Sequence, residues 1–263
     1  MERSQDARPV DDAPALLEGA VSVEAALWAR SRPFHALYLR RDRHEAEDAR
    51  LERMARSAGV PVQRVDSAEI DALAQGKTHG GVLAEVGPRR YAAFDDLLSG
   101  QAAPFVAMLD GVEDPYNFGQ AVRALYAAGA TGLVVRPRNW MSAAAVVARA
   151  SAGASERIPT AVAETAQDAA DAFRQRGLLI AVTDITRAVD VYDADLTVPL
   201  FLLVGGEKRG VTRAFADAAD VRLRIPYGRD FRMSLGTAGA ASVLAFEVMR
   251  QRRTVEMNQK RRR

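Results

Sequence analysis

The stretch of sequence that decides the fold is PLFLLVGGEKRGVT, residues 199–212. Its first half is a continuous run of apolar residues, which predicts a buried strand of a parallel sheet. A glycine pair, Gly205 and Gly206, follows at once, and another group can approach that backbone closely because glycine has no Cβ. A helical pattern then begins. The segment therefore predicts a loop at the carboxyl end of a strand, where ligands bind in open α/β sheets.

The same alternation of apolar runs and helical patterns extends over residues 104–253. The apolar runs of strand length lie at 104–112, 131–137, 178–185, 199–206 and 221–227. The helical patterns lie at 118–129, 142–152, 165–176, 212–219 and 235–252. This alternation predicts an α/β domain whose parallel sheet is covered on both faces. Three strand ends are therefore candidates for a ligand site, namely 110–123, 205–212 and 225–239.

The first part of the chain shows a second, smaller α/β pattern. A helical pattern is followed by an apolar strand at 34–40, an amphipathic helix that ends at Gly59, and strands at 60–66 and 77–86. The residues before it are polar and acidic, and the residues after it are charged and less periodic. The predicted segments are a disordered leader (1–17), a small α/β domain (18–87), a linker (88–103), a large α/β domain (104–253) and a basic tail (254–263).

The composition excludes several classes of protein. The chain has 263 residues, no cysteine and three histidines, which excludes thiolate catalysis and cysteine-ligated metal sites, so we expect no metal. No apolar run reaches the length of a membrane span, so we expect a cytoplasmic protein with no membrane contact. The net charge is +2, and the basic excess lies in QRRTVEMNQKRRR, residues 251–263. That segment either contacts phosphate groups or is a solvated helix end.

Polar residues stand at the first candidate strand end. The segment DGVEDPYNFGQAVRALYAAG, residues 110–129, passes from a turn into a helix that holds Arg123 within its first two turns. Asn117 and Gly119 are candidate caps for the start of this helix, and Gly129 for its end. At the mouth of a ligand site, Arg123 can hold a phosphate through two hydrogen bonds. The alternative is an ordinary solvated arginine on a helix.

The second and third strand ends carry further candidates. Gly205 and Gly210 have the spacing of a phosphate-binding loop, but Val211 stands where that loop requires lysine, which excludes a nucleotidase. Glu207 is either a carboxylate at the edge of a ligand site or a surface residue of a tight turn. Ser234 precedes a long apolar helix, which it can cap, and the small residues that follow it allow close packing.

The three segments, in this order, resemble the three motifs of the SpoU/TrmH family of RNA 2′-O-ribose methyltransferases, within the SPOUT superfamily. The matching residues are Asn117, Gly119 and Arg123 in the first motif, Gly205, Glu207 and Gly210 in the second, and Ile225, Pro226, Ser234 and Leu235 in the third. The stretches EGAVSVEAAL (18–27) and THGGVLAEV (78–86) resemble the beginning and end of the family's small, ribosomal-protein-like substrate-binding domain.

The resemblance implies a trefoil-knotted α/β domain that binds S-adenosylmethionine in the knot and works as a homodimer. It implies methyl transfer to the 2′-hydroxyl of a ribose in ribosomal or transfer RNA, with the helix after Ser234 in the dimer interface. The implied cofactor-binding residues are Gly205, Ile225 and Leu235. The implied catalytic residues are Arg123, Asn117, Glu207 and Ser234.

Among these roles, we favour Arg123 as a clamp on phosphate and ribose, because its pKa above about 12 makes arginine a poor base. Glu207 and Asn117 would then orient Arg123, and Ser234 would contact the nucleotide. The chain departs from the family in one residue of the third motif, where Gly236 replaces the usual asparagine.

The loop before Gly236 is also one residue longer than in the family and contains Arg229, Asp230 and Arg232. The missing amide leaves open a catalytically inactive, knotted RNA-binding protein as the alternative. We favour the enzyme, since a scaffold has no need of the polar motif residues at converging strand ends. A small-molecule methyltransferase is a weaker alternative, because of the basic tail and the apparent substrate domain.

Overall fold

The computed structural model describes residues 15–43, 46–137, 143–206 and 210–261 of the chain. The chain divides into two compact units, which are described here one at a time. The N-terminal unit comprises the residues up to Arg90 and residues 137–145, and the C-terminal unit comprises residues 91–136 and 146–263. Among the described residues, no helix is both long enough and apolar enough to cross a membrane.

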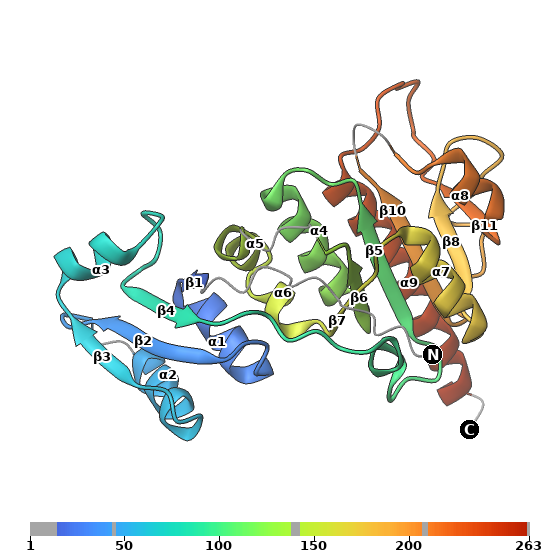
Figure 1. Cartoon of the computed structure of the whole chain (residues 1–263). Helices are drawn as coiled ribbons and strands as arrows, with labels where there is room; N and C mark the ends of the chain where they lie inside the picture. The colour runs from blue at the N-terminus through green and yellow to red at the C-terminus, as the bar shows by residue number, and fades with distance from the viewer. Residues whose placement is uncertain (1–14, 44–45, 138–142, 207–209, 262–263) are drawn as a thin grey trace, which may run out of the picture. The chain divides into compact units, whose positions relative to one another are not determined.

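The N-terminal unit is a four-stranded mixed sheet with helices (Figure 1). Its elements are β1 (Ala15–Glu18), α1 (Ala20–Ala29), β2 (Phe34–Arg40), α2 (Ala46–Ser57), β3 (Val62–Val65), α3 (Ser67–Leu73) and β4 (Val82–Val86). The strand order is β1-β4-β2-β3, and β4 runs antiparallel to both of its neighbours. The α/β pattern expected here is confirmed. β1 starts at Ala15, within the residues expected to form the leader, and it and α3 were not predicted.

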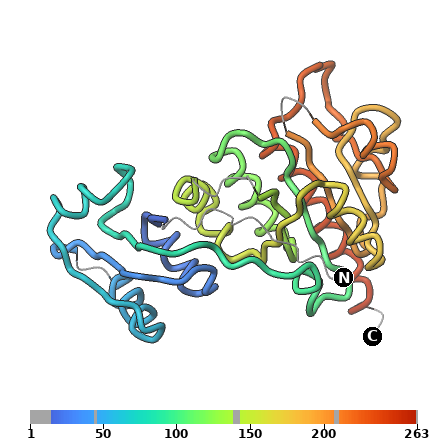
Figure 2. The backbone as a smooth tube through the Cα atoms, viewed as in Figure 1, coloured from blue at the N-terminus to red at the C-terminus, as the bar shows by residue number. Residues whose placement is uncertain are grey.

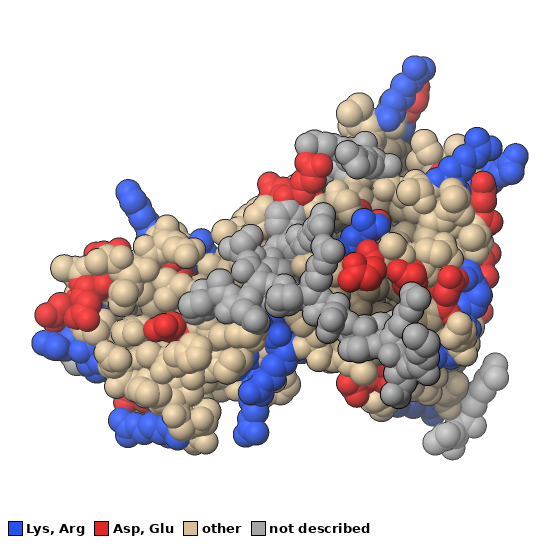
Figure 3. Space-filling view, viewed as in Figure 1, with Lys and Arg blue, Asp and Glu red and all other residues tan. Residues whose placement is uncertain are grey.

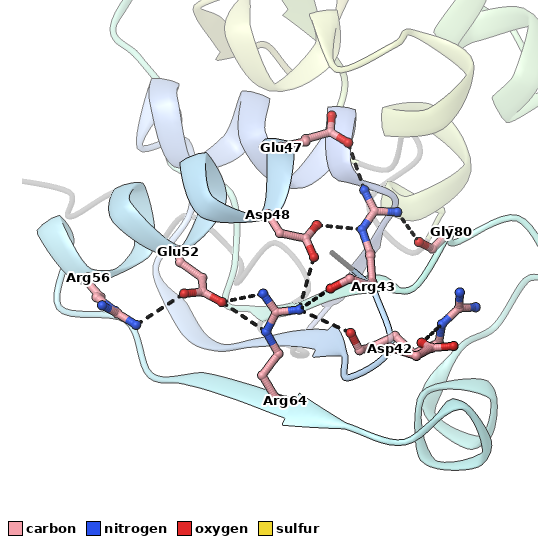
Figure 4. Close-up of polar contacts among 9 residues, drawn as sticks. Asp42, Arg43, Glu47, Asp48, Glu52, Arg56, Arg64 and Gly80 are labelled. Carbon is pink, nitrogen blue, oxygen red and sulfur yellow. Dashed lines mark hydrogen bonds and ion pairs between the residues drawn. The ribbon is translucent and has the colours of Figure 1, made fainter. Parts of the chain in front are cut away.

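A buried ion-pair network holds α2 against β3 in this unit (Figure 4). The Asp48 side chain is 2% exposed and accepts hydrogen bonds from Nε of Arg43 at 2.6 Å and Nη1 of Arg64 at 3.1 Å. Arg64 also donates two hydrogen bonds to Glu52, at 3.0 and 2.6 Å. Arg43 reaches the carbonyl of Gly80 at 2.5 Å. The network therefore joins the helix to the turn that precedes β4.

The C-terminal unit is built on a parallel sheet of seven strands in the order β7-β6-β5-β10-β8-β11-β9. The strands are β5 (Phe105–Asp110), β6 (Gly132–Val135), β7 (Thr160–Val162), β8 (Leu179–Thr183), β9 (Val189–Asp190), β10 (Leu200–Gly205) and β11 (Val221–Arg224). The helices are η1 (Phe94–Leu98), α4 (Pro115–Ala127), α5 (Ala144–Ala150), α6 (Ala154–Arg157), α7 (Ala166–Gln175), α8 (Arg213–Ala218) and α9 (Thr237–Arg261). The parallel sheet predicted from the apolar runs is confirmed.

Helices cover both faces of this sheet. Successive residues of a strand point to opposite faces, so each strand contributes to two buried layers. One set, including Met108 and Phe201, packs with Phe173 of α7 and Phe215 of α8. The alternate residues of the same strands are also buried, and α9 packs against β10 and α4. Figures 1 and 2 show α9 passing behind the strands, on the face opposite α7.

The expected linker at 88–103 is largely part of the C-terminal unit. Residues from Tyr91 onward belong to that unit, and η1 packs against its sheet. Leu97 is 1% exposed, and a Cβ built on Gly132 would lie 2.6 Å from the Leu97 Cβ. The missing side chain at Gly132 therefore makes room for Leu97. Leu97 is therefore part of the packed core of the C-terminal unit, although the charge and weak periodicity of the segment had predicted a linker.

Arg252 fixes the long C-terminal helix, α9, at the amino ends of strands β5 and β10. Its guanidinium donates to the carbonyls of Ala103 at 2.5 Å, Val198 at 2.8 Å and Leu196 at 3.2 Å. It also lies 5.8 Å from the ring centroid of Phe105. Burial lowers the pKa of Arg252. Helix α9 continues to Arg261, so the described part of the expected basic tail is helical.

Candidate active site

A hollow of about 1470 Å³ lies in the C-terminal unit, at the carboxyl ends of three neighbouring strands. Its walls come from the last residue of β8 and the turn after it (residues 183–187), from the segment around the end of β10, and from the loop that follows β11. These strands are adjacent and parallel, so their carboxyl ends meet at one edge of the sheet. Among the described residues, no group of three or more histidine and acidic side chains could hold a metal ion.

The wall after β10 depends on close contact between two glycines. The N–H of Gly206 donates to the carbonyl of Asp110 at 2.6 Å, and a Cβ on Gly206 would lie 2.0 Å from the carbonyl oxygen of Gly111. The chain turns back so that the N–H of Gly210 donates to the carbonyl of Gly206 at 2.9 Å. The group that closely approaches the Gly-Gly backbone is thus the loop after β5.

The wall after β11 is an exposed loop that is tied at both ends. The backbone N–H of Leu235 donates to the hydroxyl of Tyr227 at 2.9 Å. Thr237, the first residue of α9, donates from its hydroxyl to the carbonyl of Gly205 at 3.4 Å. These contacts hold the backbone of the third motif beside the end of β10.

Sequence reasoning missed the wall after β8. The hydroxyl of Thr183 accepts a hydrogen bond from the N–H of Gly205 at 3.2 Å. Asp184 accepts from the N–H groups of Ile185 at 2.7 Å and Thr186 at 3.0 Å. The signal for this turn was present in the sequence, because aspartate followed two residues later by threonine directly after an apolar run is typical of a side-chain-capped turn.

The charge of Asp184 is stabilised inside the hollow. Burial raises the pKa of Asp184, but the hydrogen bonds from Thr186 and Ile185 and the nearby charge of Arg222 together outweigh burial and lower that pKa. Nη1 of Arg222 lies 3.6 Å from the Asp184 carboxylate. The turn therefore presents a carboxylate that is ionised at neutral pH.

The structure brings four of the predicted site residues together. Gly205, Ile225, Ser234 and Leu235 all line the hollow. Glu207 lies outside the described residues.

The two remaining site residues lie on α4 and do not line the hollow. Asn117 is half-buried in the first turn of α4. Arg123 is exposed, about two turns beyond the start of the helix. Arg123 was expected near the mouth of a ligand site, and in its own chain it is not among the residues that line the hollow.

The cap of α4 also differs from the expectation. Asp114 caps the helix by accepting from the N–H groups of Tyr116 at 2.6 Å and Asn117 at 3.2 Å. Gly119 is instead a packing position, since a Cβ there would lie 2.6 Å from the Cβ of Ala150. Gly129, with φ of 89°, follows the end of α4, as expected.

Comparison with known proteins shows the family to which this chain belongs. The sequence model of the SpoU rRNA Methylase family matches residues 104–246. The chain belongs to the SpoU rRNA methylase family. A second family model, described as RNA 2′-O ribose methyltransferase substrate binding, matches residues 16–92. The resemblance identified from the motifs is therefore confirmed, as is an α/β fold with a substrate-binding domain at its N-terminal end.

RNA methyltransferases match this chain over most of its length. A 23S rRNA (guanosine-2′-O-)-methyltransferase, RlmB of Pseudomonas putida, is 31% identical over 89% of this chain and 95% of its own. The putative TrmH family tRNA/rRNA methyltransferase YacO of Bacillus subtilis is 30% identical over 85% of this chain and 91% of its own.

Solved structures of methyltransferases share the fold. The AdoMet-bound rRNA methyltransferase of Sinorhizobium meliloti superimposes with a TM-score of 0.75 at 26% identity, over 90% of this chain and 87% of its own. The SpoU methyltransferase AviRb of Streptomyces viridochromogenes, in complex with AdoMet, has a TM-score of 0.76 at 24% identity, over 91% and 90%. At 24% identity, the likeness to AviRb shows a shared fold only.

Proposed function

We propose that this protein transfers the methyl group of S-adenosylmethionine to the 2′-hydroxyl of a ribose in structured RNA, with 23S-type ribosomal RNA as its substrate class. The observation that carries the proposal is that Gly205, Ile225, Ser234 and Leu235, from two separate motifs, line one hollow at the ends of parallel strands. Membership of the SpoU family supports the reaction. The relatives named 23S rRNA (guanosine-2′-O-)-methyltransferases support the RNA class and suggest guanosine as the nucleotide.

The residues of the hollow fit the proposed cofactor. The hollow is lined by the apolar side chains of Val204, Ile225 and Leu235 and by the polar side chains of Thr183 and Asp184. This mixture suits an adenosyl group, which has a flat ring and polar edges. The volume, about 1470 Å³, exceeds that of a pocket for one drug-sized molecule, so it leaves space for a nucleotide as well. When bound, S-adenosylmethionine supplies an activated methyl group.

The polar residues then position the acceptor. Transfer requires the ribose oxygen to be held in line with the methyl group and its proton to have a path away. We assign Ser234, at the rim of the hollow, to contact with the nucleotide, and Arg123 to the phosphate and ribose, with Asn117 and Glu207 orienting it. Because Arg123 does not line the hollow of its own chain, this role requires a second subunit, or RNA that extends from α4 to the hollow.

We further propose that the protein is a homodimer with a trefoil knot. Exposed apolar side chains on α9 and α4, Phe246 at 43% and Tyr116 at 55%, support contact between subunits through these helices. The knot is implied by the resemblance to the SPOUT superfamily. After β11 the chain returns to α9, which packs against the central strand β10. A cytoplasmic location stays a prediction.

The decisive experiment incubates the protein with methyl-labelled S-adenosylmethionine and either unmodified 23S ribosomal RNA or transfer RNA. Alkaline hydrolysis follows, and a methyl group on the 2′-hydroxyl makes the adjacent linkage resistant. Label in resistant dinucleotides from ribosomal RNA is the expected result. RNA binding without label would support the alternative that Gly236 suggests, a catalytically inactive RNA-binding protein. Label from transfer RNA alone would change the substrate class.

A further inference from the structure

The loop after β11 exposes aromatic and basic side chains on one wall of the hollow. Phe231 is 58% exposed, Met233 67% and Tyr227 40%, and all three line the hollow. Arg229 and Arg232 alternate with them and line it too. Figure 1 shows this loop standing at the top in orange-red, and Figure 3 shows basic side chains with an acidic neighbour at its tip.

The aromatic part of the loop is held in a defined position. The Tyr227 hydroxyl accepts the N–H of Leu235 at 2.9 Å, which closes the base of the loop. The ring centroid of Phe231 lies 6.1 Å from that of Tyr227, with the planes inclined by 46°. A tilted pair at this distance is a favourable aromatic contact. Tyr227 therefore supports the Phe231 ring while more than half of Phe231 faces solvent.

The charges around the rings favour an anionic partner. No ion pair joins Arg229 or Arg232 to another residue in the part of the chain that the structure describes. Arg213 also lines the hollow, and its side chain is 90% exposed and lies 3.7 Å from Asp217. Asp230 on the loop offsets one of the positive charges. The net charge of the loop is nevertheless positive, and its arginines are available to phosphate groups.

A single exposed apolar residue is ordinary on a protein surface, but this cluster combines two rings in contact with flanking arginines. Proteins recognise unpaired RNA with this combination, because every base has a face that can stack and every nucleotide carries a phosphate. The cofactor-binding positions expected from the family lie at the base of this loop, at Ile225 and Leu235, and at the end of β10, at Gly205. The tip of the loop is therefore available to the RNA substrate.

We propose that Phe231, supported by Tyr227, stacks on an unpaired base of the RNA substrate, while Arg229 and Arg232 bind the neighbouring phosphates. The inference rests on the proposed function and assigns part of its RNA specificity to this loop. It requires the base beside the methylated ribose, or the next one, to lie outside a duplex. The loop would thus select single-stranded or distorted positions in a structured RNA.

The test measures binding of the full-length protein to an unmodified 23S ribosomal RNA transcript in the presence of S-adenosylhomocysteine, at several salt concentrations. Phe231→Ala is expected to weaken RNA binding about 5-fold to 100-fold, whereas Phe231→Trp retains it. Arg232→Gln is expected to reduce the magnitude of the negative slope of log K against log salt by about 1, whereas Arg232→Lys keeps the slope. Affinity for S-adenosylhomocysteine without RNA stays unchanged in all four variants.

Tyr192→Ala is the matched control, because Tyr192 is 53% exposed in the same unit and does not line the hollow. It is expected to bind RNA like the wild type. Equal RNA binding by Phe231→Ala and wild type would overturn the inference. If Phe231→Ala lost S-adenosylhomocysteine affinity by the same factor as RNA affinity, Phe231 would belong to the cofactor site and the inference would be overturned. A change in the oligomeric mass of Phe231→Ala in light scattering would also overturn it.

The proposed function and this inference fail in different measurements. Absence of label in the alkali-resistant dinucleotides contradicts the proposed function, whatever the loop does. Loss of RNA affinity in Phe231→Ala supports the base-stacking role even when no methyl transfer occurs. A wild-type protein that binds neither ribosomal nor transfer RNA would overturn both.

Discussion

The backbone N–H of Gly206 donates a 2.6 Å hydrogen bond to the carbonyl of Asp110. This bond joins the first residue after β10 to the last residue of β5, and the two strands are adjacent and parallel. Gly111, which has φ of 76°, lies against Gly206 so closely that neither loop leaves room for a side chain at Gly206. One wall of the hollow is therefore shaped by contact between backbones.

Replacing Gly206 with alanine is expected to displace this wall. The new Cβ would lie 2.0 Å from the carbonyl oxygen of Gly111, and relief of that overlap is expected to cost about 1–3 kcal/mol of stability. We expect at least a tenfold loss of S-adenosylhomocysteine affinity by calorimetry, with a lower unfolding midpoint. Gly228→Ala is the control, since nothing lies within 4 Å of its added Cβ. Unchanged affinity in Gly206→Ala would contradict the prediction.

Replacing Arg123 with alanine is expected to separate transfer from cofactor binding. Methyl transfer to RNA should fall by at least about 100-fold, the scale for removing one group that binds a reacting centre. Affinity for S-adenosylhomocysteine should stay within about twofold, because Arg123 does not line the hollow. Arg174→Ala, on α7, is the matched control and should leave transfer unchanged. Equal loss of transfer and cofactor affinity in Arg123→Ala would refute the role assigned to it.

The turn at Asp184 is expected to lose stability in acid. Its pKa is lowered in the folded protein, so its ionised form stabilises the fold above the unfolded pKa of about 3.9, and this contribution disappears as the pH falls through the folded pKa. Asp184→Asn keeps an oxygen acceptor for the turn but removes the charge. Urea unfolding should show wild type as the more stable protein at pH 7, and the difference should shrink below about pH 4. A difference independent of pH would argue against this assignment.

The network around Asp48 is expected to determine the stability of the N-terminal unit. Asp48→Ala leaves Arg43 and Arg64 with weaker pairing, and we expect a loss of about 3 kcal/mol, at the low end for a broken buried pair because both arginines keep a glutamate. Hydrogen exchange should accelerate in α2 and β3. Asp42→Ala is the control, because the Asp42 side chain is 71% exposed and its pair with Arg40 is worth about 0–1 kcal/mol. Equal exchange in both variants would show that the network does not carry this stability.

Much of the secondary structure follows from local pattern. The predicted strand at 34–40 is identical to β2, and all five predicted strands of the large domain contain a strand of its sheet. The segments that were missed are short, such as β1, β7 and β9. Strands of two to four residues carry too little periodicity to be distinguished from a loop. The element η1 was missed for another reason, because Leu97 is buried only through the space left by Gly132, far along the chain.

By itself, the sequence determined the type and order of most elements, the two α/β patterns and the motif residues that indicate the family. It did so because apolar periodicity and motif spacing are local properties of the chain. The tertiary structure alone decided that β10 lies between β5 and β8, that Thr183 and Asp184 join the hollow, and that Arg123 lies outside its lining. Strand order depends on which apolar faces are buried together, and that choice is made among residues far apart in the sequence.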